Sequence, residues 1–181
     1  MSRPELEELL VADPPEVWSA LGFDVVGGVV ALGGVRIRLG AEGEGIVGWR
    51  LDSGPARAPR VEHPLGAIAI DHVVMLTPDF DRTLGELRDQ GLDYRATRDA
   101  GHGFRQAFFV LGPCLLELGG PAEGDVRFWG LTLVVEDIDA AAEMLGERLG
   151  QVKDAVQPGR RIATLRREAG LGVPLALITP R

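Results

Sequence analysis

The stretch Ala69–Asp81, which reads AIDHVVMLTPDFD, sets the interpretation of the rest of the chain. Its first eight residues are mostly apolar, and their branched Ile and Val side chains favour a strand. The segment TPD at 77–79 then begins a helix, because aspartate is a common N-cap residue. The stretch therefore predicts a strand that carries one histidine, His72, and that turns directly into a helix.

This strand and helix are expected to be the first two elements of a larger structural unit. The strand is predicted over 67–76, the helix ends at Gly91, and three more strands follow over 92–98, 104–111 and 114–118. A two-residue loop at 112–113 joins the last two strands, so they are expected to form a hairpin. In that hairpin Phe108 lies opposite Glu117.

The same order of elements then repeats. A strand is predicted over 127–135, a helix over 136–149, and strands over 151–155, 160–166 and 173–179. Aligning the two helix starts gives a shift of 137 − 79 = 58 residues, which places Gly130 at the position of His72. Aligning the final strands places Leu177 at the position of Glu117. A fixed internal period of this kind indicates a fold built from repeated modules.

Residues 14–51 resemble the same unit without its first strand. The spacing of leucines predicts a helix over 5–11, and Asp13 is expected to cap a second helix that begins with Pro14. Strands are predicted over 23–26, 29–32, 35–39 and 46–51, and residues 53–66, rich in Pro, Gly and Arg, are expected to form a linker. The expected organisation is a partial module plus linker over 1–60, then a domain over 61–181 with modules at 67–120 and 126–181.

Composition excludes several classes of function. A net charge of −8 and a pI near 4.9 argue against a nucleic-acid-binding protein, which needs basic patches. One cysteine permits no internal disulfide and no cysteine zinc cluster. No apolar run approaches the length of a membrane span, and the N-terminus does not read as a signal peptide. A cytoplasmic protein with no membrane partner is the expectation.

The two units together resemble the vicinal oxygen chelate superfamily, which includes glyoxalase I, bleomycin-resistance proteins and extradiol dioxygenases. The segments that carry the resemblance are IDHVV at 70–74 with PDFD at 78–81, CLLEL at 114–118, and GLTLVVEDID at 130–139. The resemblance covers 67–181, with a weaker echo before it. It implies an α+β fold in which paired βαβββ modules form a curved, cup-shaped mixed sheet around a small-molecule ligand.

The resemblance also implies a site. Catalytic members of the superfamily hold a divalent metal (Zn, Ni, Mn or Fe) on the first and last strands of their modules, and His72 and Glu117 match those positions. Glu117 would then be a metal ligand and a proton-transfer base in a lyase, isomerase or oxygenase reaction. Gly130 and Leu177 depart from the pattern, because neither has a ligating side chain. Members often pair modules between chains, which makes a homodimer an expectation.

Alternation along the strands predicts which side chains line the cup. His72 and Val74 share a face, and Gln106 and Phe108 face the same way as Glu117. By the repeat, Phe128 and Thr132 line the facing half. The expected cup is largely apolar, and its few convergent polar groups are typical of a small-molecule site. Gln106, Phe108, Phe128 and Thr132 are the predicted substrate contacts.

Two interpretations of His72 remain open at this stage. In the first it ligates a metal, with a third ligand from His102, Gln106 or another subunit. In the second it is a buried histidine hydrogen-bonded to Glu117, and the protein is a metal-free binding protein of the bleomycin-resistance type. His63 is expected to be exposed in the linker.

A third option is a regulatory or structural module whose partial first unit occupies the cup or a partner's surface. The other chemically suggestive groups have ordinary interpretations. The aspartates at 79, 81, 137 and 139 lie in first helical turns, where negative charge suits the helix dipole. Cys114 is expected to be a packed small side chain, because the spacing places no base beside it. Arg160 and Arg161 are expected to be solvated charges at a strand edge, with binding of a substrate carboxylate as the alternative.

Overall fold

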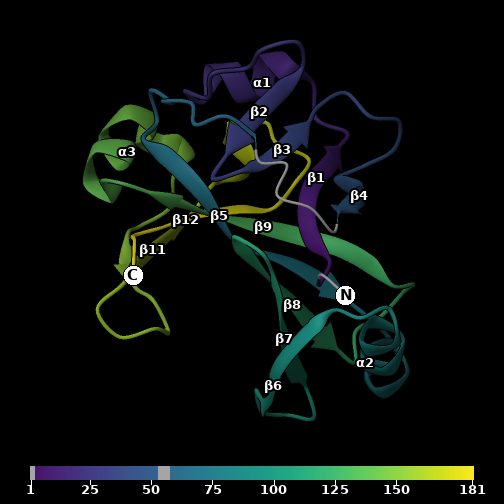
Figure 1. Ribbon diagram of the computed structural model, residues 1–181. Coiled ribbons are helices and arrows are strands. Elements are labelled where there is room, and N and C mark those ends of the chain that lie inside the picture. Colours follow the sequence, from purple (N-terminus) through teal and green to yellow (C-terminus); the bar gives the residue numbers. More distant parts are fainter. Residues whose placement is uncertain (1–2, 53–57) are drawn as a thin grey trace.

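The computed structural model describes residues 3–52 and 58–181, which fold into two mixed sheets with a few helices on their outer sides (Figure 1). The larger sheet has eight strands in the order β10-β11-β12-β9-β5-β8-β7-β6, and the smaller has four in the order β2-β3-β1-β4. The α+β class and the strand-rich modules predicted from the sequence are confirmed. The eight-stranded sheet comprises β5 (Ala67–Leu76), β6 (Asp93–Asp99), β7 (Arg105–Leu111), β8 (Cys114–Gly120), β9 (Arg127–Val135), β10 (Lys153–Asp154), β11 (Arg161–Thr164) and β12 (Leu175–Ile178).

The internal repeat appears directly in the pairing of the eight-stranded sheet. β5 and β9 pair antiparallel at its centre, and Val73 lies opposite Leu131. Because 131 − 73 = 58, the pairing reproduces the shift expected from the helix starts. Each central strand also pairs in parallel with the last strand of its own module, β5 with β8 and β9 with β12. The two modules are therefore related by an approximate twofold axis at the centre of the sheet.

The counterpart of Glu117 differs from the expected one. Val74 on β5 lies beside Glu117, and Thr132, which is Val74 plus 58, lies beside Ala176. Leu177 instead lies beside Leu133, and both are fully buried. Alignment through the preceding glycines was therefore wrong by one residue, because the segments before β8 and β12 are built differently.

The helices are capped much as the aspartates suggested. Asp79 accepts a hydrogen bond from the backbone of Arg82 and begins α2 (Phe80–Asp89), and Asp137 begins α3 (Ile138–Leu145). α3 ends four residues earlier than predicted, because Gly146 takes a positive φ of 55°. A short 3₁₀ turn, η1 (Gly146–Arg148), replaces the last helical turn, and a second one, η2 (Arg167–Ala169), precedes β12.

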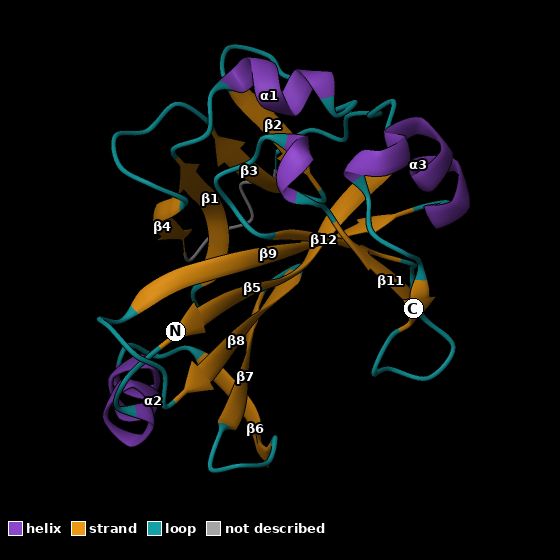
Figure 2. Ribbon diagram, turned by 180° about the vertical axis from the view of Figure 1, so that it is seen from behind, coloured by secondary structure: helices purple, strands orange, loops and turns teal. Residues whose placement is uncertain are grey.

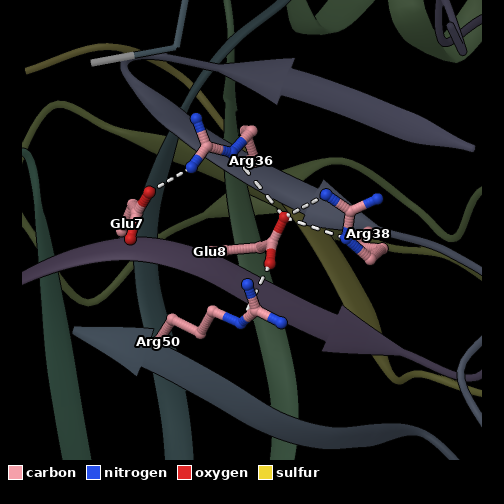
Figure 3. Close-up of polar contacts among 5 residues, drawn as sticks. All are labelled: Glu7, Glu8, Arg36, Arg38 and Arg50. Carbon is pink, nitrogen blue, oxygen red and sulfur yellow. Dashed lines mark hydrogen bonds and ion pairs between the residues drawn. The ribbon is translucent and has the colours of Figure 1, made fainter. Parts of the chain in front are cut away.

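The four-stranded sheet corrects the prediction for residues 5–11, which form a strand, β1 (Glu5–Val11), and not a helix. β1 pairs in parallel with β3 (Val35–Arg38) and antiparallel with β4 (Ile46–Asp52), and β2 (Val29–Leu32) completes the sheet. Glu8 is 1% exposed and lies among the guanidinium groups of three arginines on the neighbouring strands, as Figure 3 shows. These ion pairs let a charged residue be buried in a strand. The arginines are Arg36, Arg38 and Arg50.

Two further expectations for the N-terminal region need correction. Asp13 does not cap α1 (Pro15–Ala20); its carboxylate accepts hydrogen bonds from the indole of Trp18 at 3.1 Å and from the backbone of Gly172 at 2.7 Å. Residues 23–26 form no strand and contribute only a single bridge from Val26 to Val29. In the predicted linker, 58–66 form neither helix nor strand, and 53–57 lie outside the described residues.

The two sheets pack on each other. Figure 1 and the reverse view in Figure 2 both show the four-stranded sheet and α1 on one side of the central strands, with β6–β8 and α2 extending to the other side. Trp49 of β4 meets Phe128 of β9 edge-on, with ring centroids 5.0 Å apart. The bond from Gly172 to Asp13 joins the same two regions. None of the described helices has the length and apolar character needed to cross a membrane.

Candidate functional site

The concave face of the eight-stranded sheet holds a cavity of about 580 Å³, called the main cavity below. It lies over both modules and is reached by residues of β5, β8, β9, β11 and β12. Its wall is mostly apolar, and its polar groups are few. The apolar residues include Val74, Leu76, Phe104, Trp129, Leu131 and Ile162, and the polar ones are His72, Glu117, Thr132 and Thr164.

His72 is held from both ring nitrogens. Nδ1 lies 2.8 Å from a carboxylate oxygen of Asp71, and Nε2 lies 3.1 Å from the hydroxyl of Thr132. A carboxylate can only accept, so Nδ1 carries the proton and Nε2 of the neutral ring accepts from Thr132. In one of the two interpretations left open by the sequence the partner was Glu117, and the structure shows Asp71 and Thr132 instead. The side chain is 17% exposed, so the ring is fixed and still borders the cavity.

Asp71 links His72 to a buried arginine. Its second oxygen forms an ion pair with Nη2 of Arg160 at 2.8 Å. Burial by itself raises the pKa of Asp71, but the hydrogen bond from His72 and the interactions with Arg160 outweigh it and lower the pKa to about 2. A carboxylate at Nδ1 orients a histidine and fixes which nitrogen carries the proton. The arrangement is therefore typical of a histidine used for proton transfer, ligation or binding.

Glu117 is held by a separate hydrogen-bond chain. Nε2 of Gln106 donates to its carboxylate, and Nε of Arg98 donates to the side-chain oxygen of Gln106 at 2.6 Å. Phe108 lies opposite Glu117 in the hairpin, as predicted, with the guanidinium of Arg98 over its ring. The chain leaves part of the Glu117 carboxylate facing the cavity, which this residue lines.

The side chains in the cavity do not make a complete metal site of the kind that the resemblance implies. A catalytic metal normally has three protein ligands, and no group of three or more His, Cys, Asp or Glu side chains is gathered in 3–52 and 58–181. His72 and Glu117 are two donors. Gln106 does not add a third, because its oxygen already accepts from Arg98, and His102 is exposed on a turn outside the main cavity.

The second module contributes no donor for a reason that its backbone explains. A Cβ at Gly130 would lie 3.0 Å from the carbonyl oxygen of Pro174, which accepts a hydrogen bond from the backbone of Leu131. A histidine would not fit at 130 unless β9 and the residue before β12 separated. Ala176, the counterpart of Glu117, lines the cavity with a methyl group. The first module therefore supplies the ionisable groups of the cavity, His72 and Glu117, and the polar groups of the second module are the hydroxyls of Thr132 and Thr164.

Phe128 is displaced from its expected position. The pairing of β5 with β9 shifts by one residue between Val74 and Met75, so Phe128 lies opposite Met75 and packs on Trp49 of the other sheet. Trp129, the residue in the bulge, lines the cavity and is 51% exposed. A bulge re-aims side chains without changing the composition of the strand, so alternation alone had no signal for it.

His63 was expected to be exposed, and the structure buries it. Its Nε2 donates to the carbonyl of Ala31 at 2.8 Å, and its Nδ1 accepts from the backbone of Asp24 at 3.0 Å. Cys114 is buried as expected, and burial raises the pKa of its thiol to about 12. The aspartates in the first helical turns cap helices or pair with arginines: Asp81 binds Arg105, and Asp139 binds Arg161.

Sequence reasoning missed Asp71 and Trp129. Asp71 directly precedes His72 and was expected to face away from it. Another shift in the β5–β9 pairing falls between Ile70 and His72, and this irregularity lets the two side chains meet. The adjacent ionisable residues in the sequence, Asp71 and His72, were the available signal.

The expectation that Arg160 is a solvated charge at a strand edge was wrong. Its side chain is 5% exposed and pairs with Asp71, which lies far from it along the chain, so no local pattern reported its burial.

The comparisons with known proteins support the fold. No protein-family model matches the chain, and no curated protein matches it. Among solved structures, methylmalonyl-CoA epimerase from Mycobacterium tuberculosis has a TM-score of 0.53 at 20% identity, over 64% of this chain and 90% of that one. A methylmalonyl-CoA epimerase in complex with methylmalonyl-CoA and NH₄⁺ has a TM-score of 0.50 at 23% identity, over 61% and 92%. A hypothetical protein from Bacillus halodurans has a TM-score of 0.50 at 16% identity, over 62% and 94%.

These likenesses confirm the predicted glyoxalase-like fold. At these identities the likeness concerns the fold alone, and the site has to be argued from its own residues.

Proposed function

We propose that this chain, with its vicinal oxygen chelate fold, binds a small and largely apolar organic molecule in the main cavity. The observation that carries the proposal is the cavity of about 580 Å³ whose apolar wall converges on His72, Glu117 and Thr132. A volume of this size and a few placed polar groups are typical of small-molecule sites. A metal-free binding protein was the alternative drawn from the sequence, and the incomplete donor set favours it.

Each polar group has a distinct part in this proposal. With its hydrogen on Nε2 of His72, the hydroxyl of Thr132 accepts from a donor group of the ligand. Glu117 accepts from a hydroxyl or amide of the ligand, and Gln106 keeps its carboxylate in place. Trp129 and Phe104 cover the apolar body. Phe108 acts through Arg98 and Glu117 and does not line the cavity.

A cavity-filling variant tests the proposal with the dye 8-anilinonaphthalene-1-sulfonate as the probe. Ala176→Trp puts an indole where the cavity is apolar, so we expect the dye to lose its fluorescence enhancement. Ala140→Trp is the matched control, because Ala140 is exposed on α3. Equal dye binding by the two variants, with both folded by circular dichroism, would show that the cavity is not the binding site.

A second candidate is an isomerase that moves a proton. The specific observation is that Asp71 polarises His72 while Glu117, a second base, lines the same cavity. Two of the solved structures with this fold are methylmalonyl-CoA epimerases. In such a reaction Glu117 would take the proton next to a carbonyl, and the hydroxyl of Thr132, positioned by His72, would turn to donate to the oxygen on which charge develops.

Deuterium exchange tests this second candidate. The protein is incubated with methylmalonyl-CoA in D₂O, with and without added Co²⁺, and the α-proton signal is followed by NMR. We expect loss of signal faster than in buffer, abolished in Glu117→Gln and kept in His102→Ala, a histidine outside the cavity. Exchange at the buffer rate rejects this substrate and leaves the binding proposal unaffected.

A further inference from the structure

A second cavity, of about 420 Å³, lies beyond Asp71 at the other end of the central strands. Its lining comes from β5, from the β7–β8 hairpin and from the end of the chain. His72 borders the main cavity while its partner Asp71 borders this one, so the two cavities are separate and share a wall. Most of the remaining wall is apolar, with Val110, Leu115, Val134 and Pro180 among its residues.

Arg160 gives this cavity a buried positive charge. Only 5% of the side chain is exposed, and its Nε donates to the carbonyl of Thr179 at 2.8 Å. Nη2 has the ion pair with Asp71, but neither Nη1 nor Nη2 makes a hydrogen bond of ordinary geometry within the described part of the chain, and Nη1 has no ion pair either. A buried guanidinium nitrogen without a partner is costly, so it marks a place where an acceptor is missing.

The charges around the cavity favour an anion. Arg160 and Arg181 both line it, and Asp71 is the acidic side chain in its wall. Both carboxylate oxygens of Asp71 are already engaged, one by His72 and the other by Arg160. The group in the wall that lacks a partner is therefore a cationic N–H of Arg160. An incoming carboxylate would accept a charge-assisted hydrogen bond from it.

We infer that the second cavity binds a small aliphatic carboxylate, with its charged end on Nη1 of Arg160 and its alkyl body against the apolar wall. A fully hydrated inorganic phosphate fits less well, because the free N–H groups of one buried guanidinium and an apolar lining cannot replace its water shell. The carboxylate is that of a free acid, because the wall between the two cavities separates this site from a molecule in the main cavity.

Calorimetric titration of the full chain with butyrate tests the inference. Butyramide, which has nearly the same shape and no charge, and inorganic phosphate are the comparison probes. We expect butyrate to bind, and Arg160→Gln to weaken it by about tenfold or more, the value of one lost charge-assisted hydrogen bond. Arg161→Gln is the matched control, since Arg161 is half-exposed and pairs with Asp139. The Arg161→Gln variant is expected to bind butyrate with the affinity of the wild type.

Other results of the butyrate titration would contradict the inference. Equal binding of butyramide, preferential binding of phosphate, or unchanged binding by Arg160→Gln would overturn the inference. Ala176→Trp fills the main cavity alone, so retained butyrate binding supports the second cavity as the site. Lost binding would place butyrate in the main cavity and would overturn the inference. If Arg160→Gln fails to fold, Val110→Trp fills the second cavity from another strand, and retained butyrate binding by this variant overturns the inference.

Discussion

The centres of the two sheets have the same pairing pattern and opposite contents. In the eight-stranded sheet, His72 of β5 lies beside Leu115 and opposite Thr132. In the four-stranded sheet, Glu8 of β1 lies beside Arg36 and opposite Arg50. Each central strand thus has a parallel neighbour on one side and an antiparallel neighbour on the other.

The correspondence continues two residues further along each strand. Val74 lies between Glu117 and Gly130, and Leu10 lies between Arg38 and Gly48. We therefore interpret residues 5–52 as a rearranged module, in which β4 takes the place that the neighbouring module's first strand has in the larger sheet. The order of β1, α1, β2 and β3 is consistent with this interpretation.

The two centres differ in whether a cavity remains beside the polar side chains of the central strand, and this decides which of them can bind a ligand. Small and apolar side chains around His72 leave a cavity, and its few polar groups retain capacity for a ligand. Around Glu8, three guanidinium groups converge on one carboxylate as ion pairs, and none of these four residues lines the main cavity of the larger sheet (Figure 3). The same register therefore gives a binding surface in one case and an internal ion-pair cluster in the other.

The largest expected effect comes from breaking the chain of bonds behind His72. Asp71→Asn leaves Arg160, which is 5% exposed, without a counter-charge, and we expect a loss of about 3 kcal/mol in unfolding free energy at pH 7. Because folding lowers the pKa of Asp71 from 3.8 to about 2, its ionised form contributes stability above pH 4. That contribution is lost between pH 4 and pH 2, so the difference between variant and wild type narrows there.

Urea unfolding at pH 7 and at pH 2.5 measures this difference. Asp81→Asn is the control, since its ion pair with Arg105 is at the surface, and it is expected to have no measurable effect. A difference between Asp71→Asn and the wild type that stays constant from pH 7 to pH 2.5 would contradict the assigned role of the carboxylate.

A smaller effect is expected from breaking the ion-pair cluster of the other sheet. Glu8→Ala removes a buried carboxylate, but its partners Arg36, Arg38 and Arg50 are 33–65% exposed and can return to water. We therefore expect a loss of about 1–2 kcal/mol by urea unfolding. Glu7→Ala, which removes an outer contact of Arg36, is expected to cost less. Equal effects of the two variants would show that burial of Glu8 adds nothing.

The smallest expected effect concerns added metal. Two donors on one side of the main cavity hold a divalent ion weakly, so one equivalent of Zn²⁺ is expected to leave the midpoint of thermal unfolding unchanged. Differential scanning fluorimetry of the wild type and of His72→Ala, with and without Zn²⁺, measures this midpoint. A rise of several degrees in the wild type that disappears in the variant would show that the donor set is completed in solution.

Much of the fold could be predicted because its signals are local. The strand at 67–76 has the predicted bounds, and the two helix starts gave the shift of 58 residues that the pairing of Val73 with Leu131 confirms. β1 could not be predicted in this way. Its leucines have helical spacing, and the three arginines that make Glu8 acceptable in a strand come from residues 36–50.

The site was predicted only in part for the same reason. His72, Glu117 and Thr132 follow from strand alternation, and all three line the main cavity. The bonds that hold His72 depend on irregular pairing of β5 with β9, which alternation cannot express. The displacement of Phe128 by Trp129 has the same origin. His63 lies in a segment without regular structure, where no periodicity reports burial.

Ligands are expected to bind in the main cavity, over His72 and Glu117, and not on the corresponding face of the four-stranded sheet. The most direct measurement is a two-dimensional ¹H–¹⁵N NMR titration of the full chain with 8-anilinonaphthalene-1-sulfonate. We expect saturable changes in the backbone amide chemical shifts of Val74, Glu117, Thr132 and Ala176. The chemical shifts of Glu8, Arg36 and Arg38 are expected to stay unchanged. Shifts confined to the four-stranded sheet, or none at the four cavity residues under saturating dye, would contradict it.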